Sequence, residues 1–147
     1  AFLVPGNYTI TGTGGADVGS FHGTITIPST ATLTSPASGG TATRADGMTV
    51  NWTGGSGTVL IQVSGCTDSS CINVASATCF ASGSAGTFTI PPYVLQALPA
   101  GSSAGLVLSS QAEGSFTATG LSAGTIKTHA DMSGFGYGWG SGSFILK

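Results

Sequence analysis

The sequence predicts an all-β fold in which two antiparallel sheets pack as an immunoglobulin-like sandwich of about nine to ten strands. Short segments of alternating apolar and polar residues recur along the chain with turn signals between them, a pattern typical of sandwiches. Glycine, with 25 residues, and the many threonines and serines favour strands and turns over helices. The 147 residues suffice for one hydrophobic core, so we expect a single domain over residues 1–147.

The alternation places the strands in order along the chain. We expect them at Tyr8–Thr11, Val18–Ile27, around Leu33, and at Met48–Trp52, Val59–Val63, Ala75–Phe80, Thr87–Ile90, Leu106–Leu108, Ser115–Ala118 and Phe144–Leu146. Pro28 ends the second strand because proline cannot donate a hydrogen bond to a ladder. Residues 1–27 belong to this sandwich or are a strand pair added to it.

Two connections carry their own signals. The glycine-rich run 54–57 lies between Met48–Trp52 and Val59–Val63, which predicts a hairpin with one buried tryptophan. Prolines bound the segment near residues 92–98, which predicts one or two helical turns there and no other helix.

Charged residues are unusually few in this chain. They make up 5% of it, with three basic and five acidic side chains, against about 25% in ordinary soluble domains. Three basic residues cannot neutralise a run of phosphates, so the composition excludes nucleic acids and anionic membranes as partners. No apolar run approaches the roughly 20 residues that span a bilayer, so we expect no membrane insertion.

Three cysteines indicate the compartment of the protein. Cys66 and Cys71 enclose four polar residues, and this spacing predicts a local disulfide in an oxidising compartment. Cys66–Cys79 and Cys71–Cys79 are the alternative pairings. Cys79 lies in a strand-like stretch, where it is a buried thiol or, in the sharper interpretation, an intermolecular bridge.

Three stretches together resemble a known group of modules. They are Pro5–Gly19, Gly47–Gly55 and Gly86–Pro99, and they resemble the carboxy-terminal β-sandwich modules of large secreted proteins from Acidobacteria. The resemblance implies an extracellular, immunoglobulin-like bacterial module of unassigned chemistry. It supports fold and location more than function, because the matching residues are structural.

The sequence offers no set of residues typical of an enzyme. Gly101–Gly105 matches the G-x-S-x-G pattern of a nucleophile elbow in form, but no helix follows it as that motif requires. His22 and His129 stand outside any motif, and His22 is expected to face outward from a strand. The acidic residues are scattered singly, so we expect no metal and no cofactor; they are Asp17, Asp46, Asp68, Glu113 and Asp131.

An aromatic segment near the end is the most distinctive feature of the chain. In Gly134–Gly140, Phe135, Tyr137 and Trp139 alternate with glycines, so a strand would place the three rings on one face. The row is a core face, a contact for a protein partner, or a platform for sugar rings. Only the exposure of the rings separates these interpretations.

The composition favours a structural protein of the cell exterior. A surface this poor in charge suits a subunit that packs against copies of itself or against neighbouring domains, in a fibre, pilus-like appendage or surface layer. Strand addition through a terminal segment is the expected mechanism. The candidate donor residues are Phe2, Leu3 and Val4 at the amino-terminal end and Phe144, Ile145 and Leu146 at the other end. Alternatively, each end closes an edge of its own sheet, and the alternative function is a polysaccharide-binding or adhesion module.

Overall fold

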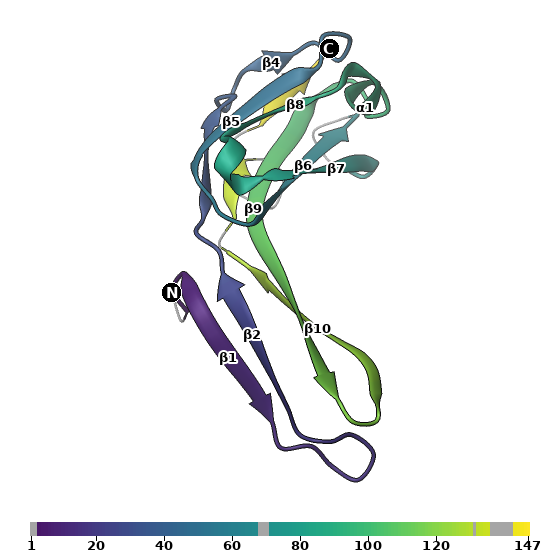
Figure 1. The fold of residues 1–147 in the computed structure, drawn as a ribbon. Coiled ribbons are helices and arrows are strands. Elements are labelled where there is room, and N and C mark those ends of the chain that lie inside the picture. The colour runs from purple at the N-terminus through teal and green to yellow at the C-terminus, as the bar shows by residue number, and fades with distance from the viewer. Residues whose placement is uncertain (1–2, 68–70, 131, 136–142) are drawn as a thin grey trace.

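The computed structural model describes residues 3–67, 71–130, 132–135 and 143–147. Within these residues the chain forms twelve strands, one short α-helix and one 3₁₀ turn (Figure 1). This confirms the predicted all-β class with mainly antiparallel sheets, and corrects the expected strand number of nine to ten. No helix among the described residues has the length and apolar character needed to cross a membrane.

The strands form three sheets. The first contains β1 (Gly6–Gly12) and β2 (Phe21–Ile27). The second has the order β3-β5-β8, with β3 (Ala31–Ser35), β5 (Met48–Gly54) and β8 (Thr87–Ile90). The third has the order β4-β12-β9-β6-β7, with β4 (Thr41–Ala42), β12 (Phe144–Leu146), β9 (Gly101–Ala118), β6 (Thr58–Cys66) and β7 (Val74–Ser82). β10 (Leu121–His129) and β11 (Ser133–Phe135) also pair with β9.

The second and third sheets enclose one hydrophobic core and form what we call the body. Side chains alternate between the two faces of a strand, so every second residue points inward. β5 contributes Val50 and Trp52 to the core, and β6 contributes Val59, Ile61 and Val63. The indole nitrogen of the buried Trp52 donates a hydrogen bond to the carbonyl oxygen of Gly83 at 2.9 Å, so its one polar atom is satisfied.

β9 is a single strand of 18 residues where two separate strands were expected, at Leu106–Leu108 and Ser115–Ala118. Its first part pairs with β6 on one side and with β12 and β11 on the other, and its last part pairs with β10. β10, β11 and β12 therefore follow one another along β9, which is one reason the strand number exceeds the expectation. No proline interrupts β9, so nothing in it prevents continuous pairing.

The last part of β9 leaves the body together with β10, and the β1–β2 pair packs against this hairpin (Figure 1). We call these two ribbons, residues 6–27 and 112–129, the arm. Ile25 and Ile27 of β2 are buried there. The amide of Gly19 donates to the carbonyl oxygen of Thr119 at 2.8 Å near the tip, so the ribbons also meet at their far ends.

The predicted hairpin between Met48–Trp52 and Val59–Val63 is wrong. β5 pairs with β3 and β8, whereas β6 pairs with β7 and β9, so the two strands lie in opposite sheets. Gly54, Gly55 and Gly57 all have φ between +68° and +79°, a backbone region that glycine adopts readily. The run carries the chain across the core instead of turning it back along its own sheet.

The two helical segments are short. α1 (Pro92–Gln96) lies inside the predicted segment 92–98, and a proline stands in its first turn, where the missing N–H costs nothing. Leu95 within the helix and Leu98 just after it are buried in the core. The 3₁₀ turn η1 (Gly83–Ala85) was not expected from the sequence.

Candidate functional site

The aromatic segment splits at the boundary of the described residues. Phe135 is 6% exposed, and its ring meets that of Phe144 edge to face, with the centroids 5.9 Å apart. A Cβ on Gly134 would overlap the carbonyl oxygen of Leu106, so glycine is required where β11 approaches β9. Tyr137 and Trp139 lie outside the described residues. Phe135 therefore belongs to the core, and a sugar platform would depend on the other two rings.

The two candidate donor ends differ in their surroundings. Phe144 and Leu146 are buried, Ile145 is partly exposed, and β12 is paired with β9 on one side and with β4 on the other. The carboxy-terminal segment therefore closes its own sheet, the alternative that the sequence left open.

The amino-terminal segment lies on the surface. Leu3 and Val4 are exposed, and the backbone of Val4 exchanges hydrogen bonds with the Tyr8 hydroxyl, at 3.2 Å from its N–H and 3.0 Å to its carbonyl oxygen. Phe2 lies outside the described residues. Two exposed apolar residues and one tyrosine contact leave this end accessible.

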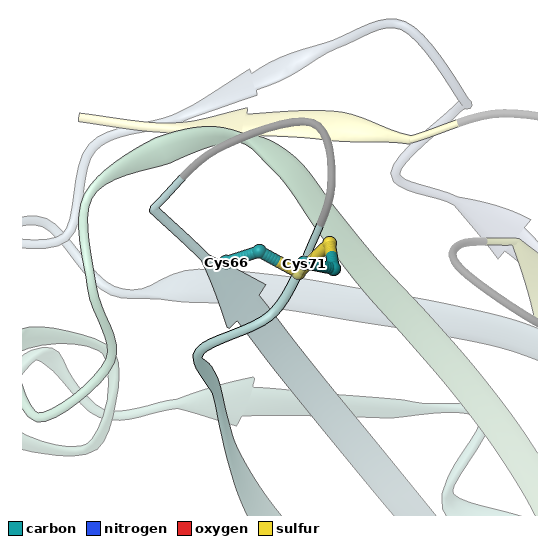
Figure 2. The surroundings of a disulfide bond; sticks show 2 residues. All are labelled: Cys66 and Cys71. Carbon is teal, nitrogen blue, oxygen red and sulfur yellow. A yellow bond between two sulfur atoms is a disulfide. The ribbon is translucent and has the colours of Figure 1, made fainter.

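The predicted disulfide is present. Cys66 at the end of β6 is bonded to Cys71, five positions later (Figure 2). Both are buried, and the bond joins the end of β6 to a residue that precedes β7. Cys79 on β7 is a free thiol, and burial raises the pKa of this thiol.

The candidate site is the open edge of β7. β7 is the last strand of the third sheet, and among the described residues no strand pairs with its other side. Its nine residues match β6 one for one, from Thr58–Ser82 to Cys66–Val74, without a register shift. Alternate residues of such an edge point their N–H and C=O groups outward, so β7 offers a regular hydrogen-bonding template.

β7 lacks the features that usually protect an edge. Monomeric proteins blunt an edge with charged residues, prolines, bulges or very short strands. The segment Val74–Ser82 contains no charged residue and no proline. On the other side of the same sheet, β4 beside β12 has only two residues, and β10 farther along β9 carries Lys127 and a register shift between Leu121 and Gly124, so shortness protects one of these edges and a charge with an irregularity protects the other. The edges of the third sheet are therefore not equivalent.

The side chains of β7 separate into two faces. Those turned toward the core are small, and they pack against it; they are Ala75, Ala77, Cys79 and Ala81. On the outer face Val74 is 54% and Phe80 58% exposed, while Ser76, Thr78 and Ser82 are also exposed. The open edge is thus bordered by small residues on one face and by two exposed apolar side chains on the other.

A groove of 480 Å³ lies beside the amino-terminal segment, between the ends of β2 and β10. Val4, Ile27 and Pro28 supply apolar lining, and Lys127 and His129 also line it. Lys127 forms an exposed ion pair with Glu113 at 3.3 Å, which contributes little to stability. The lining is mainly apolar, with one lysine already paired to a carboxylate.

Neither a metal-binding cluster nor a nucleophile elbow is present among the described residues. No group of three or more His, Cys, Asp and Glu side chains among them could hold a metal ion. Gly101–Gly105 lies inside β9, which continues to Ala118, so it has none of the strand–turn–helix geometry of a nucleophile elbow. His22 is exposed on β2, as expected, and Asp17 is exposed in the turn between β1 and β2.

The alternation over Ala75–Phe80 correctly predicted the strand β7 but not its position at an edge of the sheet. Alternation shows which residues share a face, not which strand has no neighbour. The absence of charge and proline over Val74–Ser82 was the available signal.

Comparison of the chain with protein-family models, with curated proteins and with solved structures found no match.

Proposed function

We propose that this protein is an extracellular structural module that assembles with copies of itself by strand addition, and that β7 is the accepting edge. The observation that carries the proposal is the nine-residue, uncharged and regularly paired strand at one side of the third sheet. An edge of this kind is a template for another strand. Main-chain hydrogen bonds supply affinity in such pairing, and alternating side chains fix the register.

The scarcity of charge supports assembly. The chain of 147 residues has only three basic and five acidic residues. Two of these eight, Lys127 and Glu113, form an ion pair with each other. The remaining surface consists mainly of hydroxyl, glycine and apolar groups. Contacts between such surfaces depend little on ionic strength because salt screens only interactions between charges.

The disulfide and the fold support an extracellular location. Disulfides persist in oxidising compartments and are rare in the cytosol, and Cys66–Cys71 is bonded. In this proposal the body is an immunoglobulin-like sandwich. The consecutive strands β5 and β6 in opposite sheets, and the short parallel pairing of β4 with β12, favour that arrangement. The resemblance to secreted acidobacterial modules points in the same direction.

The proposal is tested by placing a charge on the open edge. Thr78→Lys adds a lysine to the exposed face of β7, and charged residues are a common device that prevents edge pairing. Thr53→Lys is the matched control, because Thr53 is also exposed but its strand, β5, is already paired with β3 at Thr32. Both substitutions change the net charge equally.

The measurements are sedimentation velocity and electron microscopy of the purified protein at low and high salt. We expect wild type and Thr53→Lys to form assemblies at both salt concentrations, and Thr78→Lys to remain monomeric. A wild-type protein that stays monomeric, or a Thr78→Lys variant that assembles as well as the control, would contradict the proposal.

A further inference from the structure

We infer that the strand added to β7 is β7 of a second copy, antiparallel to the first, with a two-fold axis at Thr78. This inference rests on the proposed function, because it identifies the partner and the register at the same edge. The third sheet would then continue from the first copy into the second, and this contact by itself joins two copies. The resulting contact is isologous, meaning that both copies use the same surface.

The length of the strand selects the register. In an antiparallel pair related by a two-fold axis, residues at equal distances from the centre face each other. Thr78 is the midpoint of Val74–Ser82. All nine residues find partners only when Thr78 faces Thr78 of the second copy, and every other register leaves residues at both ends unpaired.

The side chains fit this register on both faces. On the outer face, Phe80 lies opposite Ser76 of the second copy and Val74 lies opposite Ser82, so each large apolar side chain meets a small one. Thr78 faces its equivalent, and pairs of threonines across two strands are favourable. The pairing would place each Phe80, which is 58% accessible in the single chain, beside the outer face of the second copy's strand.

The core-side face fits as well. Ala75 lies opposite Ala81 of the second copy, and Ala77 lies opposite Cys79. These side chains are small and already pack against the core of their own body, so two bodies could approach without overlap of large groups. The strand has no charge, so the two-fold operation brings no like charges together.

Other described segments offer less to this edge. Leu3 and Val4 precede Pro5, which cannot donate a backbone hydrogen bond. β8 has four residues and is followed directly by Pro91. β1 is uncharged, but it belongs to a sheet of only two strands, a weaker template than the edge of a large sheet.

Disulfide trapping tests the register. The variant Thr78→Cys with Cys79→Ala places two thiols directly opposite each other, where the Cα atoms of an antiparallel pair are about 4.5–5.5 Å apart. A disulfide spans about 4.4–6.8 Å between Cα atoms. The matched control is Ser76→Cys with Cys79→Ala. Its thiols would be offset by four residues along the strand, about 13 Å, and could not join.

We expect mild oxidation to convert the Thr78→Cys variant into a covalent dimer at least tenfold faster than the Ser76→Cys control. Peptide mapping should find the new bond at position 78 and an intact Cys66–Cys71 bond. Equal rates for the two variants would overturn the inference. Cross-linking of the wild type through Cys79 would also overturn it. Cys79 faces its equivalent only when the two-fold axis lies at position 79, which shifts the two strands by two residues relative to each other.

A second measurement uses the unaltered chain. Hydrogen exchange of the amides in Val74–Ser82 should slow when the protein concentration is raised, whereas exchange in β1 should not change. If wild type assembles and Thr78→Lys blocks assembly, yet no bond forms at position 78, the proposed function stands and this inference fails. If Thr78→Lys assembles as readily as Thr53→Lys, the proposed function itself fails.

Discussion

The ring of Phe21 on β2 stacks on the ring of Phe116 on β9, with the centroids 4.4 Å apart and the planes inclined by 21°. The buried Gly23 lies beside the same ring, and a Cβ there would be 2.6 Å from Ile126 Cδ1 and 3.2 Å from Phe116 Cβ. These contacts join the two ribbons of the arm, which share no backbone ladder. The arm is therefore held by apolar packing at a few positions together with the backbone hydrogen bond from Gly19 to Thr119 at its tip.

Phe116→Ala should loosen the arm and leave the body intact. The change removes the stacked ring and opens a cavity between β2 and β9, and because both rings are partly exposed we expect a loss of about 2 kcal/mol in unfolding free energy. Hydrogen exchange should accelerate in β1, β2 and β10 but not in β5 or β6. Tyr93→Ala is the control, since that residue of α1 is 74% exposed. Equal acceleration throughout the chain would show that the arm is not a separate unit of stability.

Gly120→Ala should destabilise the protein more than Gly39→Ala. The two glycines have nearly the same backbone, with φ of +82° and +83°, so alanine meets the same conformational penalty at both. A Cβ at position 120 would overlap the carbonyl oxygen of Asp17, whereas a Cβ at position 39 meets nothing within 4 Å. Urea denaturation of both variants should give a difference of about 1–2 kcal/mol. Identical midpoints would mean that the tips of the two ribbons move apart without cost.

Loss of the disulfide should lower stability moderately. The bond closes a short loop between Cys66 and Cys71, and the loop-entropy relation gives about 2 kcal/mol for a loop of this length. The double variant Cys66→Ser/Cys71→Ser should show this decrease in chemical denaturation. Reductant should destabilise the wild type by a similar amount and leave the variant unchanged. A reductant effect on the variant would have to come from another bond.

The Cys79 thiol should react slowly in the folded protein. Burial raises its pKa, so the folded state holds less thiolate, the reactive form, at any mildly alkaline pH. Iodoacetamide should label Cys79 several-fold faster in denaturant than in buffer, as followed by mass spectrometry. Cys79→Ala should take up no label.

The same pKa shift sets the direction of a pH effect. Because the unfolded chain loses this proton at a lower pH than the folded chain, the contribution of Cys79 to stability is present below the ordinary thiol pKa. It decreases as the pH rises above that value. Cys79→Ala should therefore lose less stability between neutral and alkaline pH than wild type does.

The sequence predicted which residues share a face of a strand better than it predicted which strands pair. The alternation around Val50 and Ile61 correctly identified two strands with buried residues, and the polar loop between Cys66 and Cys71 correctly indicated their bond. It did not show that β5 and β6 belong to opposite sheets, because alternation carries no information about which strands pair. The continuity of β9 was missed for a related reason, since its two predicted segments are joined by the mainly polar run Ser109–Gly114, which reads as a break.

The candidate site could not be predicted from the sequence for the same reason. The row of Phe135, Tyr137 and Trp139 predicts rings on one face, but whether that face points inward depends on the neighbouring strand, and Phe135 turned out to be buried against Phe144. The open side of β7 depends on the order of strands in the finished sheet. No local pattern encodes that order.

The length of β9 has a mechanical consequence. Its 18 residues, at about 3.3 Å each, extend roughly 60 Å, and the strand belongs to the body at one end and to the arm at the other. A tension applied along it would be shared by the hydrogen bonds to β6, β12, β11 and β10, which would have to shear together instead of opening one by one. Through this one strand, a pull at the tip of the arm is transmitted directly into the core of the body.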